Sequence, residues 1–438
     1  MNMSLFGSLL SAFFSWSWWS SDSDSDYDSL NTKNNESETI SGTDEDERIA
    51  ISGAVLASDN GSNLIEMGDG DDTLSIRGRV ESSDQGDNAI DLGEDRTVVD
   101  ITGSVLSSDN AKNSISGGAD EDDVNITGRL EASGEAVNSI DLGDGDNRLT
   151  ISSGVRAYDK ADNNILTGDG DDTISVSGGL YSESENMIDA GDGDNYIIIR
   201  SGLNADGGLN SITTGDGDDT VTIWGRIEAS SDGENIISTG DGNDRIAVQN
   251  TVEEGALTIN AGLGNDTLML SASRVSLFES AYEDWLTDYA AAPGGLGSMN
   301  VETFEVTLTR AAGISDLQWL SDLTAKANIN LQLNINANGR NLNLNTFFED
   351  GDDVFNVLSM EGSKRNTLTI DGTLSDNDYD GKALMILGDD NDRVRLSKDD
   401  WTESNLVADV PNATNYYTYT DSDGDMLFIL RDISVVMI

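Results

Sequence analysis

The acidic residues of this chain recur at three positions of a turn that repeats about every 25 residues. Aligning ten repeats gives eight, seven and seven acidic residues at these positions, so 22 of 30 are acidic, against 82 of 438 in the whole chain. The first column holds Asp44, Asp69, Glu94, Asp144, Asp169, Asp192, Asp216 and Asp241; the second holds Asp46, Asp71, Glu121, Asp146, Asp171, Asp194 and Asp218; the third holds Glu47, Asp72, Asp122, Asp172, Asp219, Asp244 and Asp266. This concentration indicates a cation site rather than an evenly acidic surface.

Stacked carboxylates need a counter-charge. Two of them one repeat apart repel by roughly 1 kcal/mol even in water, and by more at a protein surface. Calcium accepts about 6–8 oxygen ligands, including carboxylates and backbone carbonyls, whereas magnesium keeps several waters. We therefore expect Ca²⁺, bound by the aspartates of the three columns from Asp69 onward. The alternative is an acidic edge that is only solvated.

The remaining composition excludes several other chemistries. The chain has 24 Lys and Arg residues against 82 acidic ones, a net charge of −58, and neither His nor Cys. It therefore lacks a Ser–His or Cys–His nucleophile, an imidazole or thiolate metal site, and disulfides. The charge also disfavours nucleic acid and anionic membranes, and no apolar run reaches the roughly 20 residues of a membrane span.

The elements that must position these turns are short strands. Apolar Leu74, Ile76 and Val80 alternate with polar residues, which is typical of a strand with one buried face. Each repeat begins with an Asn, and the gaps between them are 25, 25, 25, 25, 23, 24 and 25 residues: Asn63, Asn88, Asn113, Asn138, Asn163, Asn186, Asn210 and Asn235. Such a period predicts an all-β fold, a parallel β-solenoid of about ten coils over residues 38–272, in which the Asn amides hydrogen-bond from coil to coil.

The turns resemble the RTX family of calcium-binding repeats, whose nonapeptide is G-G-x-G-x-D-x-U-x, with U a large apolar residue. Gly68, Gly70, Asp72 and Leu74 match its second Gly, third Gly, Asp and U, and four further turns match in the same way. The resemblance implies that Asp and turn carbonyls bind calcium between neighbouring coils. One turn per 25 residues, instead of consecutive nonapeptides, implies a wider solenoid with a single calcium edge. Some coils depart from the pattern, with Asn147, Asn195, Thr97 and Asp120 at key positions.

The flanking regions carry other signals. Residues 1–37 combine an aromatic run, Leu5 to Trp19, with a Ser/Asp stretch interpreted as a flexible linker; the run is either a cap over the solenoid end or a linking element for another subunit. Residues 273–299 contain Phe278, Tyr282, Trp285 and Tyr289 at helical spacing, which predicts a capping helix. Residues 300–438 predict a further β-rich domain. It has acidic turns at 349–353 and 388–392, and 421–425 begins like an EF-hand loop without its closing Glu.

Residues 366–438 resemble the closing module of adhesins exported by type I secretion. That family carries an uncleaved carboxy-terminal signal, an acidic residue followed by apolar ones, which Asp432 and the residues after it match. The resemblance implies an extracellular, secreted or surface-associated protein. We expect a calcium-binding structural protein, not an enzyme, that folds after export and self-assembles into a filament or layer. The alternatives are an adhesin that binds glycans or other cells, and a secreted polysaccharide-active β-helix enzyme.

Overall fold

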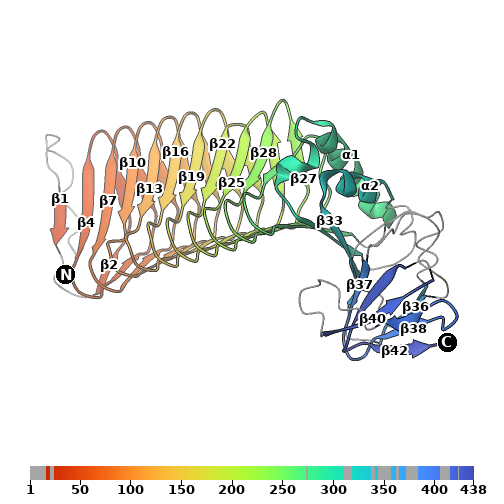
Figure 1. The fold of residues 1–438 in the computed structure, drawn as a ribbon. Coiled ribbons are helices and arrows are strands. Elements are labelled where there is room, and N and C mark those ends of the chain that lie inside the picture. The colour runs from red at the N-terminus through yellow and green to blue at the C-terminus, as the bar shows by residue number, and fades with distance from the viewer. Residues whose placement is uncertain are drawn as a thin grey trace. The chain divides into compact units, whose positions relative to one another are not determined.

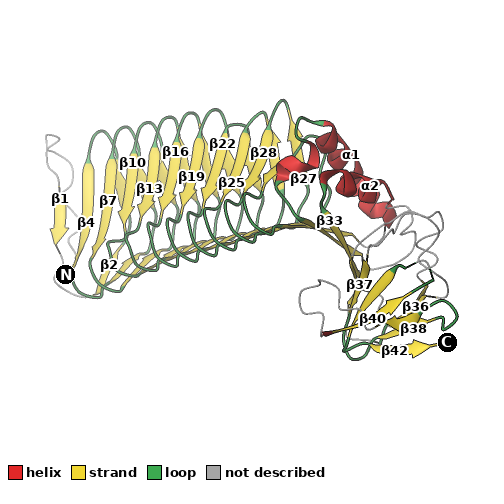
Figure 2. Cartoon of the chain, viewed as in Figure 1, coloured by secondary structure: helices red, strands yellow, loops and turns green. Residues whose placement is uncertain are grey.

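The computed structural model describes residues 16–19, 24–272, 275–308, 318–336, 341–343, 357–361, 365–370, 383–404, 415–422 and 424–438. It is an all-β protein with a parallel, stacked β-solenoid of about 13 turns, which confirms the predicted fold class but exceeds the predicted ten coils (Figures 1 and 2). The chain forms two compact units, residues 1–193 with 208–211, and residues 194–207 with 212–438.

Each coil of the first unit contributes one strand to each of three parallel sheets, here called A, B and C. Sheet A contains β1 (Trp16–Trp19), β4 (Ser37–Thr43), β7 (Ser62–Gly68), β10 (Asp87–Asp91), β13 (Lys112–Ser116), β16 (Val137–Asp141), β19 (Asp162–Leu166), β22 (Glu185–Asp189) and the start of β25 (Leu209–Thr213). Sheet B contains β2 (Asp24–Tyr27), β5 (Arg48–Ile51), β8 (Asp72–Ile76), β11 (Thr97–Ile101), β14 (Asp123–Ile126), β17 (Arg148–Ile151) and β20 (Thr173–Val176). Sheet C contains β3 (Leu30–Thr32), β6 (Val55–Ala57), β9 (Val80–Ser82), β12 (Val105–Ser108), β15 (Leu130–Ser133), β18 (Val155–Ala157) and β21 (Leu180–Ser182).

The strands alternate buried and outward residues, as predicted. Leu74 and Ile76 of β8 and Val80 of β9 are at most 1% exposed, and the residues between them face outward. Pairing is in register with the repeat, so Asn88 lies beside Asn63 on one side and Asn113 on the other. Identical positions therefore stack through the first unit.

The predicted Asn ladder is confirmed. The side-chain amide of Asn63 donates to Oδ1 of Asn88 at 2.8 Å, and Asn88 donates to Asn113 at 2.9 Å. Each amide from Asn63 to Asn163 also donates to the main-chain carbonyl seven residues earlier, as Asn88 does to Glu81 at 2.9 Å, and Asn186 donates to the Tyr181 carbonyl, five residues earlier. The same pattern continues through Asn138, Asn163 and Asn186 to Asn210. From Asn88 to Asn186 every amide in this buried column thus acts as both donor and acceptor.

A second corner of the first unit consists of stacked tight turns between sheets C and A. Two consecutive residues have positive φ in the turns up to residue 160, for example Asp59 and Asn60 at 51° and 61°, and Asp84 and Gln85 at 49° and 64°. The turns hydrogen-bond from coil to coil, since the amide of Asn60 donates to the Asp84 carbonyl at 3.2 Å. Asp and Asn tolerate this conformation best, which explains their place in the variable links.

The interpretation of residues 20–37 as a flexible linker is wrong for residues 24–32. Strands β2 and β3 already pair in parallel with β5 and β6, with Tyr27 beside Ile51 and Leu30 beside Val55. Leu30 is 1% exposed. The neighbouring coil supplies the pairing partners, so a Ser/Asp stretch with alternating residues can join the sheet without the Asp/Gly turn. Strand β1 likewise pairs with β4; residues 1–15 of the aromatic run lie outside the described residues.

The second unit continues the same strand order and then departs from it. Its sheet A strands are β28 (Glu234–Ser238) and β30 (Thr258–Asn260), its sheet C strands are β24 (Leu203–Asp206) and β27 (Ile227–Ser230), and its sheet B begins with β23 (Tyr196–Ile199), β26 (Thr220–Ile223), β29 (Arg245–Val248) and β31 (Thr267–Ala272). Sheet B then runs on in parallel through β32 (Thr303–Leu308), β33 (Asn330–Asn336), β35 (Val357–Glu361), β37 (Ala383–Leu387) and β41 (Met426–Leu430), with antiparallel β40 (Tyr416–Thr420) and β39 (Thr402–Ser404). A four-stranded sheet, here sheet D, contains β34 (Asn341–Asn343), β36 (Thr367–Ile370), β38 (Arg393–Leu396) and β42 (Ser434–Met437).

The predicted helix is present as α1 (Val275–Ala291), followed by η1 (Gly295–Met299) and later by α2 (Gln318–Ala327). Trp285 of α1 is 1% exposed and its indole donates to the Leu257 carbonyl at 3.0 Å, while Tyr289 donates to the Ile259 carbonyl at 2.9 Å. The helix therefore packs beside β30, the last strand of sheet A. Sheet B nevertheless continues beyond it, so the helix covers part of the coil without ending the parallel stacking.

Candidate metal-binding turns

The structure separates the three predicted acidic columns by burial. All predicted ligands of the first and second columns are exposed: Asp69, Asp144, Asp169, Asp192, Asp216, Asp241, Asp71, Asp146, Asp171, Asp194 and Asp218. Those of the third column are at most 2% exposed: Asp72, Asp122, Asp172, Asp219, Asp244 and Asp266. The third column is therefore the part of each turn that lies inside the coil.

In the first unit each buried carboxylate bonds to the backbone of the preceding coil. Oδ1 of Asp72 accepts the amide N–H of Glu47 at 2.8 Å, and Oδ1 of Asp122 accepts that of Thr97 at 2.8 Å. The amide N–H of Asn147 likewise donates to Oδ1 of Asp172 at 2.7 Å. The stacking of identical positions explains why the donor and the acceptor come from the same place in successive repeats.

The second unit repeats this arrangement. The amide N–H of Asn195 donates to Asp219 at 2.8 Å, that of Asp219 to Asp244 at 2.9 Å, and that of Asp244 to Asp266 at 2.8 Å. The column then ends at Glu302, whose Oε2 accepts the amide of Asp266 at 2.7 Å. Sequence alignment did not place Glu302 in the column, because helix α1 and η1 separate it from the preceding turn.

In three of these carboxylates the other oxygen is buried without a hydrogen-bond partner. This holds for Oδ2 of Asp72, Asp122 and Asp266 among the described residues. An unsatisfied buried oxygen costs about 1–3 kcal/mol, and more when it is charged. Binding of a proton or a cation would therefore stabilise these buried oxygens.

Burial also raises the pKa of these carboxyls. Desolvation is the largest cause, and it brings the pKa of Asp72, Asp122 and Asp219 from 3.8 to about 7, while that of Asp266 rises to about 6. The backbone N–H bonds described above oppose the shift. At neutral pH, without a cation, charged and protonated forms of these groups would coexist.

Asn147 shows what surrounds the unsatisfied oxygen. It stands in the third column, with Oδ1 accepting the Asp122 amide at 2.9 Å. Its Nδ2 lies among four main-chain carbonyl oxygens, of Gly143 at 3.1 Å, Asp144 at 3.3 Å, and Gly145 and Thr167 at 2.9 Å. In stacked coils the Oδ2 of an aspartate at this position meets the corresponding ring of carbonyls.

The exposed second column makes bonds in the opposite direction, to the following coil. Oδ1 of Asp46 accepts the amide N–H of Asp71 at 3.1 Å, and Oδ1 of Asp146 accepts that of Asp171 at 3.0 Å. In the second unit Oδ1 of Asp218 accepts both N–H groups of Asn243, from the backbone at 2.8 Å and from the side chain at 2.9 Å. These carboxylates organise the backbone of the turn.

The donor set fits a hard cation such as calcium. Carboxylate and carbonyl oxygens are its usual ligands, and its geometry is flexible. Within the described residues no three acidic side chains come close enough to hold a metal by themselves. A cation here would be held by one buried carboxylate together with main-chain carbonyls, and the exposed columns would supply further charge. Glycines keep this space open, because a Cβ on Gly117 would lie 2.1 Å from Oδ2 of Asp122.

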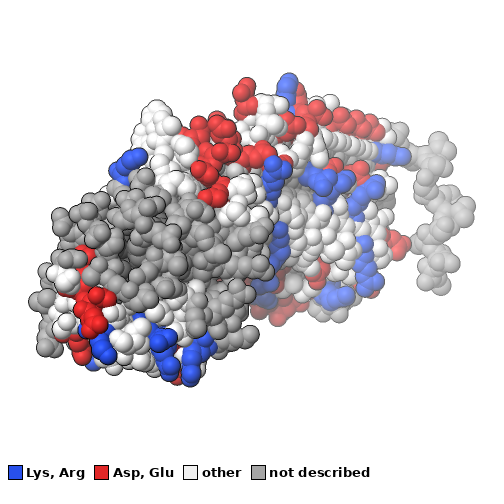
Figure 3. Space-filling view, turned by 90° about the vertical axis from the view of Figure 1, so that its right-hand side faces the viewer, with Lys and Arg blue, Asp and Glu red and all other residues white. Residues whose placement is uncertain are grey.

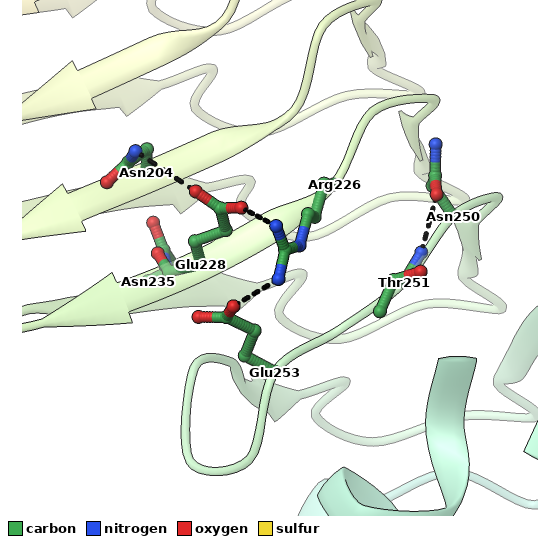
Figure 4. Close-up of polar contacts among 7 residues, drawn as sticks. All are labelled: Asn204, Arg226, Glu228, Asn235, Asn250, Thr251 and Glu253. Carbon is green, nitrogen blue, oxygen red and sulfur yellow. Dashed lines mark hydrogen bonds and ion pairs between the residues drawn. The ribbon is translucent and has the colours of Figure 1, made fainter. Parts of the chain in front are cut away.

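Acidic residues elsewhere are balanced differently. On sheet C an Arg-x-Glu pair recurs, as in Arg129 and Glu131, 3.0 Å apart. Figure 4 shows the second unit's version, in which the Arg226 guanidinium bridges Glu228 and Glu253. In the space-filling view acidic atoms form a row along one edge, and Lys and Arg lie on the face beside it (Figure 3). Arginine residues thus neutralise glutamates on the sheet face, whereas the buried turn oxygens lie near main-chain carbonyls.

Two acidic turns of the carboxy-terminal region are also described. Asp392 is 1% exposed, and its Oδ1 accepts the amide N–H of Asn366 at 2.9 Å, as in the third column. Oδ1 of Asp421 accepts the amides of Gly424 and Asp425, both at 3.0 Å, in the hairpin between β40 and β41. The predicted turn at 349–353 lies outside the described residues.

Comparison with protein-family models, with curated proteins and with solved structures gave no match. Across the described residues no helix is long and apolar enough to cross a membrane. The fold and the turns therefore define the class of this protein: a parallel β-solenoid whose coils stack buried carboxylates on one another.

Proposed function

We propose that the chain is a secreted, calcium-binding structural protein of the cell surface or extracellular matrix. It folds on binding calcium after export and self-assembles into a filament or layer. The observation that carries the proposal is the row of buried carboxylate oxygens without hydrogen-bond partners, as in Asp72 and Asp122, at a place ringed by carbonyls. The resemblance to RTX turns supports the same conclusion.

The chain's own residues have defined tasks in this proposal. Oδ1 of Asp72 and of Asp122 fixes the turn by accepting the amide of the preceding coil, and Oδ2 is left for the cation. The second-column carboxylates fix the backbone whose carbonyls complete the site. Bound calcium supplies the positive charge that these oxygens otherwise lack. Because the unfolded chain has no such site, calcium binding adds directly to folding stability.

Export in an unfolded state follows from this linkage. Extracellular calcium modules bind at about 10⁻⁴–10⁻³ M, so sites of that class stay empty in a low-calcium cytosol and fill outside. The carboxy-terminal resemblance to type I secreted adhesins supports this route. Resistance to urea that is equal in EGTA and in calcium would contradict it.

Self-assembly has candidate contact surfaces in each unit. In the first unit, β2 and β3 each have one strand neighbour among the described residues, which leaves an edge. In the second unit, β38 is the one strand neighbour of β42 within the part of the chain that the structure describes, and Val436, Met437 and Ile438 are 37%, 41% and 38% exposed. Exposed apolar edge strands favour strand addition between molecules.

Negative-stain electron microscopy tests the proposal. Protein refolded from denaturant with millimolar calcium should form ordered filaments or sheets, whereas protein in EGTA at equal ionic strength should not. The variant Val436→Lys/Met437→Lys should fold with calcium but fail to assemble, and Leu277→Lys, at a helix residue 43% exposed, is the matched control. Folded, monodisperse particles with calcium would refute the assembly part.

A glycan-binding adhesin is the second candidate, and two exposed aromatic residues favour it. Tyr196 and Trp224 are 43% and 48% exposed, and both face outward from sheet B of the second unit. Trp224 lies four residues farther along the strand direction than Tyr196 and one coil away. The two residues are therefore separated by roughly 13 Å along the strands and by about 4.8 Å between coils. Thr220 lies beside Tyr196 on the same face. Aromatic faces with a hydroxyl group beside them suit the apolar faces and hydroxyls of a sugar chain.

Retention on neutral polysaccharides in affinity electrophoresis tests this candidate. Trp224→Ala should abolish retention, and Leu263→Ala, at a residue 71% exposed, should leave it unchanged. Retention that is equal in both variants would rule the aromatic pair out.

A further inference from the structure

Not every coil has the same need for a cation. Asn147 occupies the third column in the same pose as the aspartates on either side. Its Oδ1 accepts the Asp122 amide at 2.9 Å, and its own amide donates to Asp172 at 2.7 Å. The replacement of Asp by Asn therefore leaves the stacking of the coils unchanged.

The difference lies at the second side-chain atom. Nδ2 of Asn147 carries two hydrogens and has four carbonyl oxygens within 3.3 Å, including Gly145 and Thr167 at 2.9 Å. It is a donor placed among acceptors. All of its partners are main-chain atoms of its own turn and of the next coil.

Asp122 presents an oxygen to the equivalent space one coil earlier. A Cβ on Gly117 would lie 2.1 Å from Oδ2 of Asp122 and 2.3 Å from the Leu142 carbonyl oxygen, so both oxygens face one small space. Leu142 corresponds to Thr167 in the register of the coils. Oδ2 has no hydrogen-bond partner. Oδ2 of Asp122 and the Leu142 carbonyl oxygen are both hydrogen-bond acceptors, so only a proton or a cation between them makes the arrangement favourable.

We infer that the Asn147 amide takes the place of the cation, so that this coil closes without calcium while the Asp122 coil requires it. The inference rests on the proposed calcium function and specifies where in the first unit that function is absent. The number of calcium ions bound is therefore smaller than the number of acidic turns. The Asn147 coil remains ordered where calcium is low and offers the adjoining coil a formed surface on which to stack.

Reciprocal substitutions test the inference, with bound calcium counted by native mass spectrometry at pH 7.5. Asn147→Asp should bind one more calcium than the native protein and should melt at a lower temperature in EGTA, with recovery in calcium. Asp122→Asn should bind one fewer and should melt at a higher temperature in EGTA. Asp87→Asn, an exposed residue of β10, makes the same charge change outside the turns and should alter neither quantity.

The outcomes separate the two proposals. No calcium on the native protein would refute the proposed function itself. Calcium on the native protein with unchanged counts in both reciprocal variants would overturn the inference alone. A lower melting temperature of Asp122→Asn in EGTA would also overturn it, because the new amide would then not satisfy the carbonyl ring.

Discussion

The Asn ladder allows a quantitative prediction from the first unit. Asn113→Ala removes three hydrogen bonds at once: donation to the Leu106 carbonyl at 2.7 Å, donation to Asn138 at 2.9 Å, and acceptance from Asn88 at 2.9 Å. A hydrogen bond contributes about 1 kcal/mol net, and buried partners left unsatisfied cost about 1–3 kcal/mol. Asn113 is 2% exposed, so water does not replace the lost bonds. We expect unfolding free energy to fall by about 3–5 kcal/mol.

Urea denaturation in saturating calcium, followed by circular dichroism, measures the change. Asn125→Ala is the control, because this outward residue of β14 makes one side-chain bond, to Asp100 at 3.0 Å, and should cost under about 0.5 kcal/mol. Solenoid stability is roughly a sum of coil and interface terms, so the denaturant slope must be compared as well. A loss below about 1 kcal/mol at unchanged slope would show that the ladder does not stabilise the stack.

Three further predictions concern other parts of the molecule. In EGTA the protein should lose stability as the pH rises from about 4 to about 7, because burial raises the pKa of carboxyls such as Asp122 from 3.8 to about 7 and the folded state retains their protons; thermal melts across this range check it, and a flat profile contradicts it. Tyr282→Phe should cost about 1–2 kcal/mol in urea denaturation, since its hydroxyl contacts two buried carbonyls at 3.0 and 3.1 Å; no loss would mean that these bonds are dispensable. Gly93→Ala should unfold several degrees below Gly255→Ala, because both have positive φ but only at Gly93 would a Cβ clash, 1.7 Å from a carbonyl oxygen; equal melting would exclude steric contact as the cause.

Much of the solenoid was predictable because its signals are local and repeated. The alternation of Leu74 and Ile76 with polar residues gives the strand face, and the 25-residue gaps give the register. The helix at 275–291 followed from aromatic spacing alone. Each of these features depends on residues that are close together in sequence, and the stacking of coils repeats the strand pattern along the solenoid.

The differences arise where a neighbouring coil decides the structure. Residues 24–32 lack the Asn and Asp/Gly pattern, yet they pair because β5 and β6 offer free partners. Gln85 adopts a φ of 64° because the turns above and below impose it. The burial of Asp72 beside the exposed Asp71 also could not be read from composition, since both belong to one acidic run. The sequence located the acidic turn, and the stacking determined which oxygen is left unsatisfied.

The two buried polar columns have different chemical requirements, and this difference is the strongest physical argument for an external ligand. An Asn side chain is donor and acceptor, so the column from Asn63 to Asn210 satisfies itself as each coil is added. An ionised Asp side chain only accepts. Its Oδ1 is satisfied by the preceding coil, but Oδ2 of Asp72, Asp122 and Asp266 has no donor. The fold therefore contains one column whose coils supply one another's donors and acceptors and one in which some oxygens need a proton or a cation, and at Asn147 the chain itself supplies the missing donor.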